Sequence, residues 1–253
     1  MAGHSKWANI KHRKAAQDKK RGKLFTRIIK EITIAARDGG GDLDSNPGLR
    51  LAVQNAKGAN MPKDTVERAI KKGTGGDGAS LAEITFEGYA SNGIAVFVEA
   101  TTDNNNRTVA SVRSVFNKYG GNLGTNGSLG FIFDRKGVFT VNKTVVEGKD
   151  IEELEMELID GGLEEMNEVD DAIILYTSFD DFGNMQTLLD TLNIEVSNAE
   201  VQRVPNNTTQ LDVESSKKVL RLIDKMEDDE DVNCVYHNLE MTDELVEVLE
   251  SED

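Results

Sequence analysis

Ten lysines and arginines lie in the first thirty residues, against a single acidic residue, Asp18, and the chain's one tryptophan, Trp7, lies among them. Basic side chains bind the phosphates of a nucleic acid whatever its base sequence, and an indole can stack on an unpaired base. This pattern predicts binding of a nucleic acid. The alternative is a solvated basic surface, with Trp7 packed on the helical bundle predicted below. The residues predicted to bind are Lys6, Trp7, Lys11, His12, Arg13, Lys14, Lys19, Lys20, Arg21, Lys23 and Arg27.

The charge of the remaining chain has the opposite sign. The 253 residues carry a net charge of −16, yet residues 1–80 hold 17 basic and 8 acidic side chains. Residues 137–204 hold 3 basic and 17 acidic side chains, and residues 205–253 hold 4 and 15. Such an asymmetry indicates a polyanion-binding end. The acidic part would repel phosphate, and a basic protein is the partner that it could meet.

Two further segments could make polar contacts. Asn104-Asn105-Asn106-Arg107-Thr108 lies at a predicted helix start, where it could cap the helix or contact a ligand. We include Asn106 and Arg107 among the nucleic-acid-binding candidates. The glycine-rich segment GGNLGTNGSLG, residues 120–130, allows close approach of its backbone to phosphate or to a neighbouring domain.

No motif makes a positive case for an enzyme. Gly73-x-Gly75-x-x-Gly78 follows a predicted helix rather than a strand, which a dinucleotide site would require. The three histidines lack metal-ligand spacing, and the single cysteine, Cys234, excludes a disulfide framework. We therefore predict no catalytic residue, metal or cofactor. The sequence also lacks a membrane-spanning stretch and a secretory signal, so we expect a cytoplasmic protein with no membrane partner.

Helical periodicity dominates residues 1–80. An apolar stripe ends at Gly39-Gly40-Gly41, and Asn46-Pro47 begins a second helix. A third helix starts at Pro62 and ends in Lys71-Lys72-Gly73. Three short amphipathic helices predict a bundle that buries their stripes against each other. Residues 4–23 are too basic to join that core, so we expect them to form an arm that is mobile or is ordered by a ligand. The first stripe consists of Phe25, Ile28, Ile29, Ile32 and Ala36.

Strand patterns begin after residue 80. A hairpin, a helix over Thr108–Tyr119 and a strand at Phe131–Phe133 come first. A strand at Val138–Val141 opens the order βαββαβ, which is ferredoxin-like. The last helix and strand lack a sheet of their own and would complete the earlier one. We predict an α+β fold: a three-helix bundle (1–80), then two ferredoxin-like α/β domains, the third (137–204) inserted in the second (81–136 with 205–253).

Four blocks within residues 2–137 resemble the YebC/PmpR family: GHSKWANIKHRK, NMPKDTVERAIKKGTG, TDNNNRT with VRSVFNKYGGNLG, and GSLGFIFDRKG. The resemblance implies three domains, the first helical and the others α/β. It implies a DNA-binding regulator of transcription; mitochondrial relatives activate translation, and bacterial relatives are connected with stalled ribosomes. Asn105 departs from the arginine more usual in the family, which removes one cation there.

We therefore expect a cytoplasmic, non-enzymatic regulator of gene expression that binds duplex DNA. The alternative is a ribosome- or RNA-binding translation factor that acts in elongation and contacts ribosomal RNA.

Overall fold

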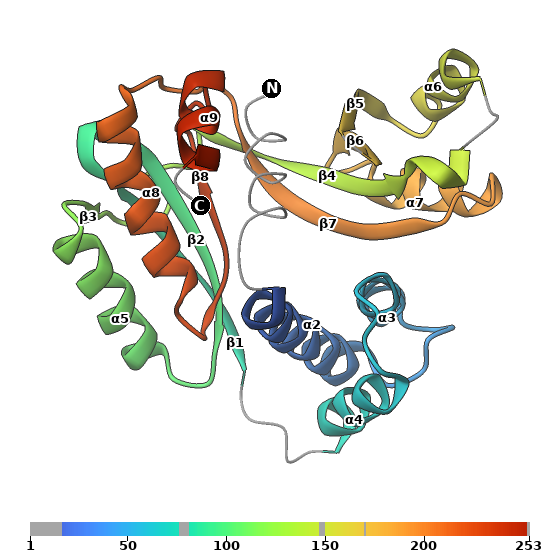
Figure 1. Ribbon diagram of the computed structural model, residues 1–253. Helices are drawn as coiled ribbons and strands as arrows, with labels where there is room; N and C mark the ends of the chain where they lie inside the picture. The colour runs from blue at the N-terminus through green and yellow to red at the C-terminus, as the bar shows by residue number, and fades with distance from the viewer. Residues whose placement is uncertain (1–16, 76–80, 147–149, 170, 252–253) are drawn as a thin grey trace. The chain divides into compact units, whose positions relative to one another are not determined.

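The computed structural model describes residues 17–75, 81–146, 150–169 and 171–251. These residues form two compact units (Figure 1). One unit holds residues 17–75 and 135–203, and the other holds residues 81–134 and 204–251. Each unit is described separately below.

Three helices precede the first sheet: α2 (Gln17–Gly39), α3 (Pro47–Gly58) and α4 (Lys63–Thr74). Asn46 caps α3, its side chain accepting a hydrogen bond from the amide of Leu49 at 3.0 Å, and Pro47 follows. Gly40 adopts a φ of 85°, the left-handed conformation that ends a helix. The predicted stripe is confirmed as the core of the three helices, which buries Ile28, Ile32, Ala36, Leu49, Ala52, Ala56 and Ala69.

The first helix begins earlier than we expected. Residues 17–23, assigned above to a mobile or ligand-ordered arm, belong to α2, whereas residues 4–16 lie outside the described part of the chain. Lysine, arginine and glutamine have good helix propensity. A helix can therefore continue beyond the last residue that packs in the core.

The acidic sheet contains the strands β4 (Phe133–Asn142), β5 (Leu163–Val169), β6 (Ala172–Ser178) and β7 (Val196–Pro205). Their order is β5-β6-β4-β7, so β6 lies between β4 and β5, the split βαβ arrangement. The short helix η2 (Lys143–Val146) follows β4. Helices α6 (Ile151–Ile159) and α7 (Phe182–Thr191) provide the core with Leu154, Leu158, Met185 and Leu189.

We expected the three helices to bury their apolar stripes only against each other, but they also pack against the acidic sheet. Half-buried Leu51 of α3 packs against the core of the acidic sheet. The buried side chain of Asn55 donates to the carbonyl of Ala199 at 2.8 Å and accepts from its amide at 2.9 Å. Gly58 lies so close to the Ser197 carbonyl that a Cβ atom would overlap it. The helices and the strand β7 thus pack as one unit.

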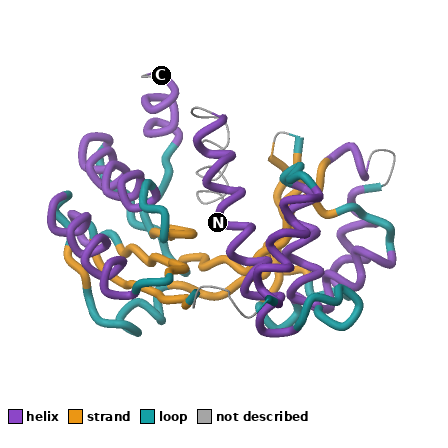
Figure 2. The backbone as a smooth tube through the Cα atoms, turned by 90° about the horizontal axis from the view of Figure 1, so that it is seen from below, coloured by secondary structure: helices purple, strands orange, loops and turns teal. Residues whose placement is uncertain are grey.

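The other unit has the sheet order β3-β1-β2-β8. Strand β8, far along the chain, pairs antiparallel with β2. Figures 1 and 2 show α5 and α8 on the same side of this sheet, where Phe116 and Leu222 are fully buried. The elements are β1 (Ala82–Tyr89), η1 (Ser91–Gly93), β2 (Ala95–Thr102), α5 (Asn105–Lys118), β3 (Asn122–Leu123), α8 (Val213–Glu227), β8 (Val232–His237) and α9 (Asp243–Ser251).

The glycine-rich loop packs a second, smaller cluster made of Ala95, Phe97, Leu129 and Phe133. The predicted strand at Phe131–Phe133 is wrong, because Phe131 and Ile132 lie in a turn and β4 begins at Phe133. The Ile132 amide bonds the Leu129 carbonyl at 2.9 Å, which keeps the segment turned instead of extended.

The predicted fold class is confirmed: helices at the N-terminus precede two four-stranded sheets in a mixed α/β chain. The division into residues 1–80, 81–136 with 205–253, and 137–204 stays a prediction. Among the helices that the structure describes, none combines the length and apolar content needed to cross a bilayer.

Candidate nucleic-acid interface

Helix α2 carries two predicted binding residues whose side chains are described, Lys23 and Arg27. The Arg27 guanidinium donates to Glu31 of the same helix at 2.7 Å and also pairs with Glu200 on β7. Both Lys23 and Arg27 are half-buried. Arg27 therefore serves first to hold α2 against the acidic sheet, and its positive charge is balanced within the unit.

Helix α4 presents a row of cations that our sequence analysis missed. Arg68, Lys71 and Lys72 are exposed on the face opposite the buried Val66 and Ala69. The exposed acidic residues Asp64 and Glu67 lie beside Arg68 and Lys71 on this face. Within the described residues neither Lys71 nor Lys72 forms an ion pair. The two lysines also complement the negative end of the helix dipole. The signal was visible as Lys71-Lys72, which we interpreted only as the end of a helix.

The acidic sheet neutralises selected cations of the helices. Besides the Arg27–Glu200 pair, Lys57 at the end of α3 contacts Glu195 at 2.8 Å. This contact lowers the pKa of Glu195, first through the hydrogen bond and then through the charge of Lys57. The helix faces turned towards β7 are thus balanced, whereas the outer face of α4 keeps the charge of Lys71 and Lys72.

Nine further candidates belong to residues 6–21, which we call the basic segment. Six of them lie outside the described residues: Lys6, Trp7, Lys11, His12, Arg13 and Lys14. Three others, Lys19, Lys20 and Arg21, occupy the first turns of α2. Their roles stay predictions.

Asn106 and Arg107 lie in the other unit, at the start of α5. The structure therefore does not bring them together with Lys23 and Arg27 within one unit. Asn104 is the N-cap, its side chain accepting from the Arg107 amide at 3.1 Å, so the capping alternative holds for this residue. The Asn106 side chain is exposed.

The Arg107 guanidinium is engaged by carboxylates of its own chain. It donates to both oxygens of Asp231, at 3.0 and 2.8 Å, and to Asp103 at 2.9 Å. Asp231 also accepts from the hydroxyls of Thr108 and Thr102. Burial disfavours the charged form of Asp231, but the hydrogen bonds from Arg107, Thr108 and Thr102 outweigh it and hold its pKa below the ordinary value.

This network ties α5 to the segment that precedes β8. The same contacts, led by the hydrogen bond with Asp231, raise the pKa of Arg107, so its charge is permanent. About half of the Arg107 side chain, 54%, stays exposed. A phosphate contact by Arg107 stays a prediction, and its structural role in the unit is the one that the geometry displays.

The glycine-rich loop surrounds an internal acidic side chain. The buried carboxylate of Glu87 accepts from the amide of Gly127 at 2.7 Å and from that of Leu129 at 2.6 Å. Successive backbone amides of this kind can bind anions. Here the chain supplies the carboxylate itself, so these two amides are already occupied.

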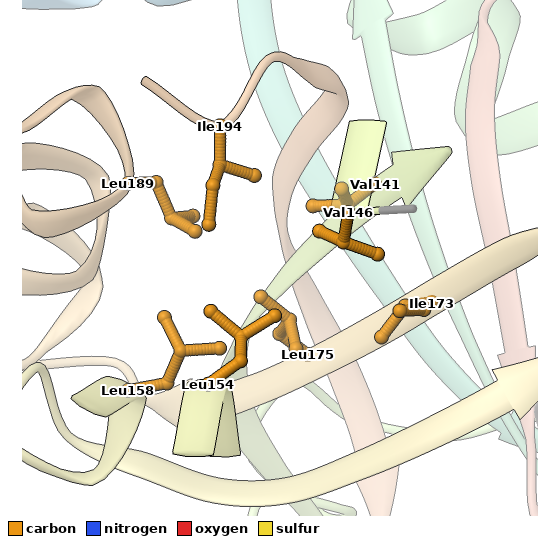
Figure 3. A pocket seen from close by; sticks show the side chains of 8 residues that line it. All are labelled: Val141, Val146, Leu154, Leu158, Ile173, Leu175, Leu189 and Ile194. Atoms are coloured by element: carbon orange, nitrogen blue, oxygen red, sulfur yellow. The ribbon is translucent and has the colours of Figure 1, made fainter. Parts of the chain in front are cut away.

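Metal sites and ligand pockets each require a particular arrangement of side chains. The described residues contain no group of three histidine, cysteine or acidic side chains able to hold a metal ion. Cys234 is half-buried on β8. The pocket in Figure 3 is an apolar gap of about 10 Å³ in the core of the acidic sheet, between side chains such as Leu154 and Ile194. It has room for at most one water and offers no polar partner.

Two family models match the chain. The model described as "TACO1/YebC protein N-terminal domain" matches residues 5–76, and "TACO1/YebC second and third domain" matches residues 81–239. A probable transcriptional regulatory protein of Amoebophilus asiaticus is 51% identical over 241 residues, covering 94% of this chain and 98% of that protein. A probable transcriptional regulatory protein of Photobacterium profundum is 50% identical over 251 residues, covering 98% and 100%.

A solved structure is also similar. The crystal structure of the conserved hypothetical protein Aq1575 from Aquifex aeolicus matches with a TM-score of 0.81 and 40% sequence identity. The match covers 91% of this chain and 94% of that one.

Proposed function

Because the chain belongs to the TACO1/YebC family, whose relatives are named as regulatory proteins rather than enzymes, we propose that it is a cytoplasmic, nucleic-acid-binding regulator of transcription that grips duplex DNA. The observation that supports it best is the concentration of positive charge in residues 1–80 of a chain whose net charge is −16. Neutralising phosphates releases counterions from DNA, which favours binding whatever the base sequence.

The contact divides between the basic segment and α4. Lys11, Arg13 and Lys14 supply phosphate contacts from the segment, and Lys71 and Lys72 supply them from the outer face of α4. The acidic sheet repels phosphate and so limits the contact to this side of the helices. A basic protein is the partner that the acidic sheet would attract.

RNA in the ribosome is the second candidate, with a role in translation. It is favoured by an exposed aromatic side chain, Phe131, on the uncharged loop of the other unit. Folded RNA displays unpaired bases in its loops, whereas duplex DNA keeps its bases stacked.

Charge reversal tests the proposal. We expect a triple variant of the basic segment to bind duplex DNA at least about tenfold more weakly for every sequence, because three phosphate contacts become repulsive. A control triple makes the same change in net charge on α5 and α8 and should retain most of the affinity. The variants are Lys11→Glu, Arg13→Glu and Lys14→Glu, against Lys118→Glu, Lys218→Glu and Lys225→Glu.

Equal losses in the two triple variants would contradict the proposal, since only the net charge would then matter. A pull-down of the tagged protein separates the two candidates. Release by deoxyribonuclease supports DNA, and co-sedimentation with ribosomes that resists this nuclease supports RNA.

A further inference from the structure

Phe131 is 75% exposed, more than any other large apolar side chain in the described part of the chain. Burying a phenylalanine side chain typically stabilises a protein by about 1.5–3 kcal/mol. Its neighbour Phe133 is buried against Phe97, with ring centroids 6.0 Å apart. The fold thus buries one of the two rings and leaves the other in solvent.

The exposed ring is carried by a firmly held loop. Glu87 anchors the amides of Gly127 and Leu129, and the fully buried Leu129 side chain fixes the loop to the sheet. On the other side of Phe131, the Asn206 amide donates to the carbonyl of Ile132 at 2.8 Å. The Asn206 side chain donates to the carbonyl of Phe131 itself at 3.2 Å. A ring presented in this way needs little ordering when it binds.

The loop that precedes the ring is open and uncharged. Residues 119–133 contain no charged side chain, although the chain as a whole is strongly acidic. One exposed residue of each sign, Asp134 and Arg135, follows the loop, and the Asn206 side chain also donates to the Asp134 carboxylate at 3.4 Å. A Cβ atom at Gly127 would meet nothing within 4 Å, and one at Gly130 would first meet an atom at 3.7 Å. The side chains of Thr125 and Asn126 are exposed on the same loop and offer hydrogen-bonding groups. A flat, neutral ligand with polar edges could therefore approach closely.

We propose that Phe131 is a stacking platform for an unpaired nucleobase, whose edge is met by Thr125 and Asn126. This inference rests on the proposed nucleic-acid binding and specifies a different part of the ligand: helices and basic segment meet phosphates, whereas the loop meets a base. Aromatic stacking is available to every base. The uncharged loop avoids the phosphate repulsion that the acidic sheet would cause.

The test compares probes with and without unpaired bases. These are an RNA hairpin, a DNA hairpin of the same sequence, and an RNA duplex with as many phosphates as the hairpins. We expect Phe131→Ala to bind a hairpin about tenfold more weakly, from the loss of one stacked base, and to bind the duplex as the parent does. The hairpin that shows the loss identifies RNA or melted DNA as the source of the base.

Three further variants give the reason for the loss. Phe131→Tyr keeps the aromatic face and should keep the affinity, whereas Phe131→Leu keeps an apolar side chain without that face and should bind as Phe131→Ala does. Phe179→Ala removes a 42% exposed ring from the other unit, one whose centroid lies 3.8 Å from the Arg135 guanidinium, and should leave the hairpin affinity unchanged. Because Phe131 is so exposed, thermal unfolding should be the same for all variants at this position.

Unchanged hairpin affinity in Phe131→Ala, while the basic-segment triple variant loses affinity for all probes, would overturn the stacking site and leave the proposed function standing. Equal affinity of Phe131→Leu and the parent would also overturn it, since a simple apolar contact would then suffice. If the parent protein binds none of these probes, the stacking site is wrong, and if it also fails to bind duplex DNA, the proposed function is wrong as well.

Discussion

Asn55 tests whether the helices and the acidic sheet form one unit. Its side chain is 7% exposed and pairs with both backbone groups of Ala199, which is itself 1% exposed. In Asn55→Ala, the amide and the carbonyl of Ala199 would lose their partners in a place that water cannot readily reach. A buried polar group left without a partner costs about 1–3 kcal/mol. Two such groups should lower the free energy of unfolding by about 2–6 kcal/mol.

Gln54, the preceding residue, provides the matched control. Its side-chain oxygen accepts from Gln186 of α7 at 3.2 Å, also between α3 and the acidic sheet with its helices, but both side chains are half-buried. Since water can replace that bond, Gln54→Ala should cost less than about 1 kcal/mol. Urea denaturation measures both variants, and hydrogen exchange at the Ala199 amide should accelerate only in Asn55→Ala. Equal stability of the two variants, with unchanged exchange at Ala199, would refute the reasoning.

Two other substitutions examine single contacts. Asp231→Asn should lower the free energy of unfolding by about 1–3 kcal/mol at pH 7. Because the pKa of Asp231 is depressed in the folded protein, this difference from the parent should persist down to about pH 4 and disappear as the pH falls further. Urea denaturation at several pH values measures it, and a difference that stays constant below that pH would contradict the prediction. Gly58→Ala should destabilise the protein, because the added Cβ atom would overlap the Ser197 carbonyl. Gly183→Ala on α7 is the control: its Cβ atom would meet nothing within 4 Å, so the change should be neutral or stabilising. Equal melting temperatures of the two variants would disprove the close approach at Gly58.

Local signals in the sequence predicted the elements well. Asn46-Pro47 predicts the start of α3 because a capping side chain and a fixed φ both favour that position. The glycines at 39–41 predict the end of α2 because Gly40 can adopt a positive φ. The alternation of strands and helices from residue 138 predicts the order βαββαβ, in agreement with β4 to β7.

Contacts between distant residues were not predictable in the same way. The pairing of Arg27 with Glu200 and of Asn55 with Ala199 joins positions that no periodicity relates. The hydrogen bonds from the glycine-rich loop to Glu87 were not predictable either, because an acidic residue within a strand pattern usually faces solvent. The error at Phe131–Phe133 has the same origin, since local propensity favours a strand there and tertiary contacts impose a turn.

The two lysines on α4 show a further limit of our sequence reasoning. Lys71 and Lys72 were visible, but their exposure and their lack of ion pairs among the described residues depend on the packing of α4. By contrast, Arg27 and Arg107 counted as binding candidates by charge alone, although both are engaged by carboxylates of the chain. Residue type therefore predicted which positively charged residues are candidates. Only the fold separated the exposed Lys71 and Lys72 from the arginines that pair with carboxylates.

The salt dependence of duplex-DNA binding tests phosphate recognition by the basic residues most directly. If about half of the ten cations in the first thirty residues meet phosphates, log K against log salt concentration should have a slope of about −4 to −5. Replacing Lys71 and Lys72 by glutamine should bring the slope closer to zero by about 1–2, whereas the same changes at Lys218 and Lys225 should leave it unaltered. An affinity that does not depend on salt concentration would contradict the account. So would an equal change of slope in the two double variants.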